Sequence, residues 1–125
     1  MACIMVVDDD DLSRIYLSEL LKRAGYTVQE AGSGLECLEQ VARHHIDLFI
    51  TDIFMPMMDG LELLSLLLKE RPDHKIIAMS GGGSGMSQSL ALDVAEKLGA
   101  IGLISKPFKM NEVIHTVASV LQEAP

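Results

Sequence analysis

The sequence has little of what characterises secreted, disulfide-rich or membrane proteins. It contains no tryptophan and only two cysteines in 125 residues. Cys3 and Cys37 form no CxxC pair, so we expect both to be reduced core residues of an intracellular protein. No apolar segment approaches the roughly 20 residues that a membrane-spanning helix needs. Acidic residues directly follow the first short apolar run, which is not a signal-peptide pattern. We therefore expect a soluble, cytoplasmic protein.

The chain is also poor in positive charge. It has 10 lysines and arginines against 18 aspartates and glutamates, a net charge of -8 and a pI of about 4.8. Such a surface repels phosphate backbones and anionic lipids, which argues against direct binding to nucleic acid or membranes. A cation or a basic protein surface is the expected partner.

Short apolar runs rich in β-branched residues alternate with helical periodicity along the whole chain. Strands are predicted at 3–7, 26–31, 46–51, 75–79 and 101–104, and helices at 12–24, 34–43, 60–70, 87–98 and 110–122. The strands are hydrophobic on both faces, which indicates an α/β fold of the (βα)5 type with a parallel sheet between helices. The length and the 49% hydrophobic content fit one domain over residues 1–125, with no linker or repeat.

Local signals mark the ends of the predicted helices. Gly25 and Gly99 are expected to end helices, and Ser33 and Asp59 to act as N-caps. The helix after Ser33 is predicted to carry three apolar residues on one face: Leu35, Leu38 and Val41.

Polar residues stand where the predicted strands end. These residues are Asp8, Asp9, Asp52, Ser80 and Lys106. The carboxyl ends of parallel strands meet at one edge of a sheet, and binding sites in α/β proteins lie beyond that edge. We therefore expect these side chains to converge.

The chemistry of the converging groups favours phosphoryl transfer. Crowded carboxylates raise one another's pKa unless a cation intervenes, and Mg²⁺ is a hard divalent cation that carboxylates bind. Lys106 offers a point charge for a phosphate oxygen, and Ser80 offers a hydroxyl donor. A carboxylate nucleophile, a metal, an ammonium and a hydroxyl are what transfer of a phosphoryl group to aspartate needs.

Most of these residues also have a simpler interpretation. The acidic run after the first strand fits helix capping, a role we expect for Asp10 or Asp11. Lys106 alone is typical of a solvated surface lysine, and Ser80 alone of a turn. Asp52 is harder to explain in this way, because an unpaired carboxylate at the end of a buried strand costs free energy.

Motifs along nearly the whole chain resemble the receiver domain of two-component response regulators, a family that includes the single-domain chemotaxis regulator. The matching segments are "IMVVDDD" (4–10), "LFITDIFMPMMDG" (48–60), "IIAMS" (76–80) and "ISKPF" (104–108). The resemblance implies a flavodoxin-like fold with strand order 2-1-3-4-5.

The resemblance also implies roles for single residues. Asp52 looks like the phosphoacceptor, Ser80 like the switch residue that turns toward the phosphoryl group, and Lys106 like the lysine that contacts it. The peptide bond between Lys106 and Pro107 is usually cis in this family. The implied Mg²⁺ ligands are Asp8, Asp9, Asp52 and the backbone carbonyl of Phe54, with Asp9 the more direct of the paired acids.

The sequence departs from the family pattern in two places. Leu103 stands where the family has a switch aromatic. Coupling between Ser80 and the output surface is therefore expected to use the packing of Leu103 or a different route. The stretch that follows Ser80 is longer than usual and rich in glycine over 81–85. Phe54 and Gly82 flank the expected phosphoryl site. We expect Phe54 to shield the acyl phosphate from water and Gly82 to offer no polar side chain, which would slow self-dephosphorylation.

The resulting hypothesis is a switch rather than an enzyme. A sensor histidine kinase or phosphotransfer protein would pass a phosphoryl group to Asp52 with Mg²⁺ bound, and the change would bias a surface formed by 87–98, 101–104 and 110–122. The output would be a downstream protein target or an output domain absent from this chain.

Three other functions compete with the phosphorylation switch. One is a receiver-fold interaction module that is never phosphorylated. A hydrolase of the aspartyl-phosphatase kind is disfavoured because position 54 is phenylalanine where that chemistry needs a second acid. A nucleotide- or flavin-binding protein is disfavoured because the edge is acidic.

Overall fold

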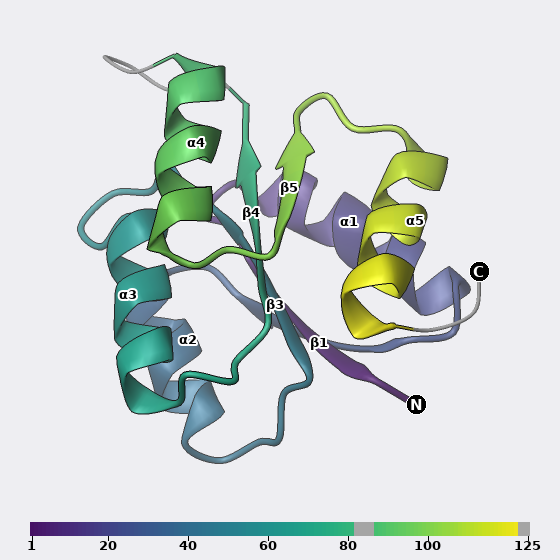
Figure 1. Ribbon diagram of the computed structural model, residues 1–125. Helices are drawn as coiled ribbons and strands as arrows, with labels where there is room; N and C mark the ends of the chain where they lie inside the picture. Colours follow the sequence, from purple (N-terminus) through teal and green to yellow (C-terminus); the bar gives the residue numbers. More distant parts are fainter. Residues whose placement is uncertain (82–86, 123–125) are drawn as a thin grey trace.

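A computed structural model of the chain shows a five-stranded parallel sheet with helices on both faces (Figure 1). It describes residues 1–81 and 87–122. The strand order is β2-β1-β3-β4-β5, so the predicted flavodoxin-like (βα)5 fold is confirmed. The strands are β1 (Cys3–Val7), β2 (Thr27–Ala31), β3 (Leu48–Asp52), β4 (Ile76–Ser80) and β5 (Gly102–Ser105). The helices are α1 (Asp11–Arg23), α2 (Gly34–Val41), α3 (Gly60–Glu70), α4 (Gln88–Leu98) and α5 (Met110–Leu121).

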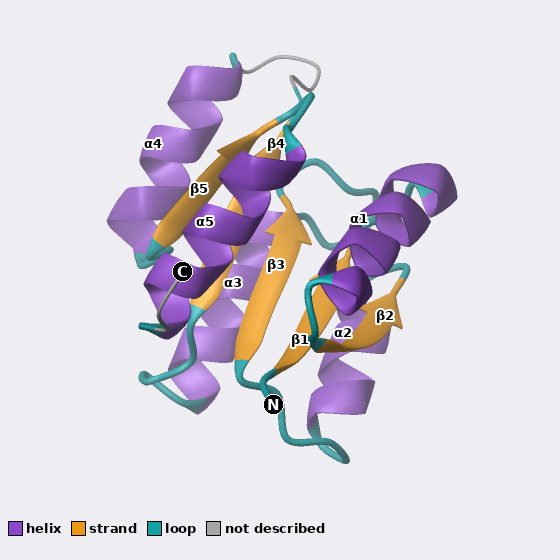
Figure 2. Ribbon diagram, turned by 90° about the vertical axis from the view of Figure 1, so that its right-hand side faces the viewer, coloured by secondary structure: helices purple, strands orange, loops and turns teal. Residues whose placement is uncertain are grey.

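The sheet separates two layers of the hydrophobic core. Helices α2, α3 and α4 cover one face, whereas α1 and α5 cover the other, which is turned toward the viewer in Figure 2. Along β1, Ile4 and Val6 join the layer that contains Leu17 of α1, while Met5 and Val7 join the opposite layer. Both faces of the strand are therefore buried, which is why its sequence is apolar throughout rather than alternating.

The helix ends lie where the local signals predict. Ser33 and Asp59 are N-caps, and each side chain accepts a hydrogen bond from the backbone N–H three residues further on. Asp10 does the same for α1, so the acidic run does contain a cap. Gly25 and Gly99 follow helices with φ of 101° and 121°, a left-handed conformation that favours glycine.

The helix faces that are buried in the structure differ in part from those that the spacing of apolar residues predicts. Leu35 of α2 is exposed and does not share the buried side of its helix, which is formed around Cys37. In α1, Leu12 and Tyr16 are exposed, and Leu17 lies in the core. Apolar residues surround much of this helix, so the spacing predicts a helix without identifying its inner face. Among the described helices, none is long and apolar enough to cross a membrane.

Two central strands end in polar residues. Asp52 is the last residue of β3 and Ser80 the last of β4, each one position beyond the predicted strand end. The expectations for Gly82 and for most of the glycine-rich stretch fall outside the described residues.

Gly60, at the start of α3, occupies a place with no room for a side chain. Its N–H donates a hydrogen bond to the carbonyl oxygen of Ile53 at 2.7 Å. A Cβ at this position would overlap the carbonyl oxygen of Asp52 and lie 2.7 Å from the Cα of Ile53. These are backbone atoms, so no side-chain rotation can relieve the overlap.

We expect Gly60→Ala to lower the free energy of unfolding by about 2 kcal/mol, as forced overpacking does. The free energy of unfolding is measured by urea denaturation, with circular dichroism as the signal. Gly32→Ala is the matched control, since a Cβ there meets only Arg14 and Glu36 atoms at 3.5 and 3.7 Å. Equal unfolding midpoints for the two variants would contradict the prediction.

Candidate functional site

The carboxyl edge of the sheet brings together residues that are far apart in the sequence. In the parallel register, Val7 of β1 pairs with Thr51 of β3, so the residues that follow them, Asp8 and Asp52, emerge side by side. Asp52 in turn pairs with Met79 of β4. The expected convergence of strand ends is therefore present.

Three carboxylates form a cluster at this edge. One oxygen from each of Asp8, Asp9 and Asp52 lies within 4.8 Å of the others. Asp8 is fully buried and Asp52 is 8% exposed, whereas Asp9 is exposed. Clustered carboxylate oxygens, with one face open to solvent, fit a hard divalent cation such as Mg²⁺.

Lys106 reaches into the cluster from the segment after β5. Its Nζ lies 2.9 Å from Oδ2 of Asp8 and 3.0 Å from Oδ2 of Asp52. Its backbone N–H donates to the carbonyl oxygen of Ser80 at 2.9 Å, which ties this segment to β4. The side chain is only 19% exposed, so the interpretation as a solvated surface lysine is wrong. The bond between Lys106 and Pro107 is cis, as expected.

Backbone donors hold the remaining oxygens of the two buried acids. Oδ1 of Asp8 accepts a hydrogen bond from the N–H of Asp10 at 3.0 Å. Oδ1 of Asp52 accepts one from the N–H of Phe54 at 3.3 Å. Both carboxylates are thus oriented by the turns that follow their strands. The metal-ligand role of the Phe54 carbonyl stays a prediction.

Burial and charge act on the titration of this site in opposite directions. Burial raises the pKa of Asp52, the hydrogen bond and charge of Lys106 lower it, and Asp8 raises it again, so the result lies above the ordinary value. For Lys106, burial lowers the pKa, but the bonds to both acids outweigh that effect and raise it. Lys106 therefore remains an ammonium at neutral pH.

Ser80 differs from the other residues of the edge. It is fully buried, and its Oγ has no hydrogen-bond partner among the residues that the structure describes. Most buried polar groups are paired, so an unpaired hydroxyl at the edge of the sheet calls for an explanation, although Ser18 in α1 is also buried without a partner among the described residues. The predicted role of Ser80 as a simple turn residue does not fit, because Ser80 lies in β4.

Arg14 was missed by the sequence interpretation. It lies in α1, and its guanidinium donates to the carbonyl oxygen of Asp8 at 2.9 Å. Its spacing from Asp11 is compatible with an ion pair within the helix, but nothing in the sequence indicates the backbone contact.

The match to known proteins agrees with this geometry. A family model described as "Response regulator receiver domain" covers residues 4–118. The chain belongs to this family. It is a receiver domain of two-component signalling, as the motifs of the edge predict. Receiver domains generally bind Mg²⁺ and are not enzymes in the usual sense, and the cluster of Asp8, Asp9 and Asp52 provides oxygens for such an ion.

Relatives of this receiver domain include both short and long proteins. It is 33% identical over 118 residues to the chemotaxis protein CheY of Thermotoga maritima, covering 94% of this chain and 95% of that protein. It is 37% identical to the DNA-binding transcriptional regulator NtrC of Azospirillum brasilense, covering 96% of this chain and 24% of the regulator. Among solved structures, Vibrio cholerae CheY4 has a TM-score of 0.86 at 28% identity, covering 96% of this chain and 98% of that one. The chain spans 13% of the length of one curated relative, the sensor kinase CckA of Brucella abortus, and 24% of NtrC.

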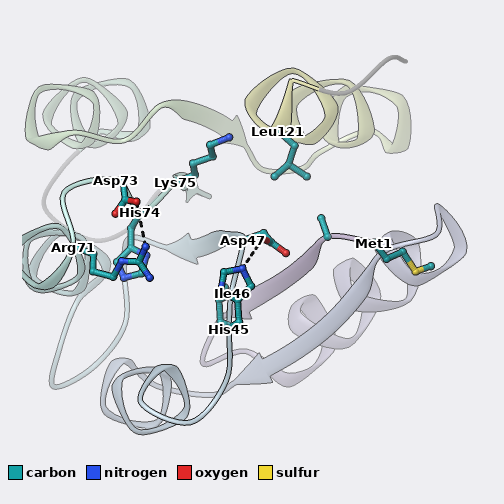
Figure 3. Close-up of a pocket in the computed structure, with 10 residues that line it drawn as sticks. Met1, His45, Ile46, Asp47, Arg71, Asp73, His74, Lys75 and Leu121 are labelled. Atoms are coloured by element: carbon teal, nitrogen blue, oxygen red, sulfur yellow. Dashed lines mark hydrogen bonds and ion pairs between the residues drawn. The ribbon is translucent and has the colours of Figure 1, made fainter.

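A separate cavity lies at the opposite edge of the sheet, where the strands begin (Figure 3). Its volume is about 430 Å³, and none of the predicted site residues lines it. Two pairs of its polar side chains interact locally: His45 and Asp47 share a hydrogen bond at 2.9 Å, and Arg71 forms an ion pair with Asp73 at 3.2 Å.

Asp52→Asn is expected to raise the thermal stability of the receiver domain at neutral pH in metal-free buffer. The raised pKa of Asp52 means that its charged form is penalised in the folded state at pH values above that pKa. The penalty is lost as the pH falls through the folded-state pKa and is absent below the ordinary pKa of the carboxyl, so the gain should shrink over that range.

Calorimetric melting of both proteins across this pH range checks the prediction. Asp73→Asn is the control, because Arg71 lowers the pKa of that exposed carboxyl and its loss should not stabilise the fold. A melting temperature for Asp52→Asn below that of the native domain at neutral pH would contradict the predicted penalty on the charged form of Asp52.

Proposed function

We propose that this receiver domain is a phosphoacceptor switch in which Asp52 receives a phosphoryl group in a Mg²⁺-dependent reaction. The observation that carries the proposal is the position of Lys106, whose ammonium lies between the carboxylates of Asp8 and Asp52. A cation held over the end of a buried strand can neutralise an anionic phosphoryl oxygen as well as a carboxylate.

The metal would be held by Asp8, Asp9, Asp52 and the backbone carbonyl of Phe54. When bound, Mg²⁺ neutralises charge on the phosphoryl oxygens and helps to orient them. Asp9 suits direct contact with an arriving ion, because it is exposed and makes no hydrogen bond or ion pair with its side chain among the described residues.

The proposed reaction is a displacement at phosphorus by the carboxylate of Asp52. A carboxylate oxygen of Asp52 attacks the phosphorus of a phosphohistidine, the new O–P bond forms, and the N–P bond breaks. The electron pair of the broken bond stays on the histidine ring, which then takes up a proton. Burial of Asp52 removes part of the hydration shell that a free carboxylate would have to shed.

Ser80 and Lys106 provide the response to the new charge. The phosphoryl oxygens accept hydrogen bonds from the Ser80 hydroxyl and the Lys106 ammonium. The movement of these two side chains toward the phosphoryl group biases the conformation of the surface made by α4, β5 and α5. Leu103 lies on β5, is partly buried and packs against the core beneath α4. It therefore takes the place of an aromatic switch in coupling the site to this surface.

The partners follow from this chemistry. The donor is a sensor histidine kinase or a phosphotransfer protein, and the output is a downstream protein target or an output domain absent from these 125 residues. The acidic charge of -8 disfavours direct contact with nucleic acid or membrane, and we place the domain in the cytoplasm.

Phosphoryl transfer can be tested with a small donor. Incubation with phosphoramidate and Mg²⁺ should add one phosphoryl group, detected by intact-mass spectrometry, and Asp52→Asn should abolish the addition. Lys106→Ala should slow it strongly, whereas Lys109→Ala, which removes an exposed lysine from the cap position of α5, should not. Persistent labelling of Asp52→Asn would place the acceptor elsewhere. Failure of the native chain to react would favour the interaction module that is never phosphorylated.

The lifetime of the phosphorylated state tests the role of Phe54. This residue is partly exposed beside Asp52 and is expected to shield the acyl phosphate from water. Phe54→Ala should therefore lose its phosphoryl group faster than the native domain in a mass-spectrometric decay experiment. Met57→Ala is the control from the same loop, since Met57 is 96% exposed. An unchanged or slower decay for Phe54→Ala would reject the shielding hypothesis.

A further inference from the structure

One guanidinium group joins three elements beside the acidic cluster. Nη1 of Arg14 donates to the backbone carbonyl oxygen of Asp8 at 2.9 Å, at the end of β1. Its Nε donates to Oε1 of Glu30 in β2 at 3.0 Å, and its Nη2 donates to Oδ1 of Asp11 in the first turn of α1 at 2.8 Å. The Arg14 side chain is 16% exposed, so it forms part of the packed structure rather than a surface ion pair.

Hydrogen bonds hold the backbone on both sides of Asp8, and the Arg14 contact holds the peptide that joins Asp8 to Asp9. The N–H of Asp8 donates to the carbonyl oxygen of Ala31 at 3.1 Å, and its carbonyl accepts from Arg14. The Asp8 carboxylate is held separately, by Asp10 and Lys106. The exposed carboxylate of Asp9 has no such support among the described residues, so its place depends on the backbone that carries it.

We propose that Arg14 is a positioning residue for the metal site, which holds the Asp8–Asp9 peptide so that the Asp9 carboxylate meets Asp52 around one ion. The proposal rests on the metal-binding function proposed above and assigns a residue that the motifs of the edge do not include. Groups behind a metal ligand commonly orient it, and their loss typically costs about tenfold or more in metal affinity.

The anchors of Arg14 are themselves fixed. Glu30 lies on β2, and its backbone carbonyl accepts a hydrogen bond from Nε2 of Gln40 in α2 at 2.8 Å. Burial lowers the pKa of Arg14, but the bonds to Asp11 and Glu30 raise it by more, so the guanidinium stays charged. A chain of hydrogen bonds therefore runs from α2 through β2 to the turn that bears Asp9.

Charge alone and positioning predict opposite results for the same substitution. Arg14→Ala removes a positive charge from the neighbourhood of an acidic site, and by Coulomb attraction alone it should strengthen the binding of a divalent cation. If Arg14 orients the Asp8–Asp9 peptide, the same change should weaken binding. Arg14→Lys separates the effects further, because it keeps the charge but replaces the planar fork with a single point donor.

The experiment measures Mg²⁺ affinity and folding stability on the same proteins. The chain has no tryptophan, so Mg²⁺ is titrated while amide NMR spectra are recorded, and urea denaturation gives the free energy of unfolding. We expect the Kd for Mg²⁺ to rise about tenfold in Arg14→Ala and to rise also in Arg14→Lys. At saturating Mg²⁺, labelling of Asp52 by phosphoramidate should approach the native level, because the nucleophile is intact.

Arg71→Ala is the matched control. It removes an arginine that forms an ion pair at 3.2 Å with Asp73 at the opposite edge, so its Mg²⁺ affinity should equal that of the native domain. An unchanged or lower Kd in folded Arg14→Ala or Arg14→Lys would overturn the positioning role, even if stability fell. Absence of Mg²⁺ binding by the native domain would instead overturn the proposed metal-dependent function, and the positioning role with it.

Discussion

The structure depends on a cation held among carboxylates at the end of a buried sheet. Asp8 is fully buried and Asp52 nearly so, and two such charges side by side would repel each other in a medium that screens them poorly. Lys106 offsets this repulsion with an ammonium that hydrogen-bonds to both. The turn that only Gly60 allows and the contacts of Arg14 then hold the loops that carry the acids. The fold therefore has to hold the Lys106 ammonium at hydrogen-bonding distance from both carboxylates.

The topology of the sheet explains why these groups meet. Lys106 is separated from Asp8 by 98 residues and from Asp52 by 54, so only the parallel arrangement of strands brings them together. After β1 the chain continues into α1 on one face, whereas after β3 it leads to α3 on the other. The two loops diverge at adjacent strand ends, and this reversal of direction is the position where ligands bind in open α/β sheets. Asp9, the exposed acid, follows directly after Asp8 at this position.

Much of this arrangement could be predicted from the sequence, because the signals are local or repeated. The apolar strands follow from burial on both faces, and the caps at Ser33 and Asp59 follow from side-chain chemistry within one turn. The inner face of α1 could not be predicted, since apolar residues such as Leu12 and Leu17 lie on both sides of it. The hydrogen bond from Arg14 to a backbone carbonyl was also hidden, because backbone acceptors leave no trace in the sequence.

The solitary hydroxyl of Ser80 has a consequence for how the site favours one ligand over water. Folding has already withdrawn this group from solvent, and among the described residues nothing has replaced the lost hydrogen bond. A phosphoryl oxygen bound as proposed would gain a hydrogen bond from a donor that folding has already withdrawn from solvent, and preorganised donors of this kind act strongly. The preference of the site for a phosphoryl group would then come partly from the position of Ser80 in the folded chain.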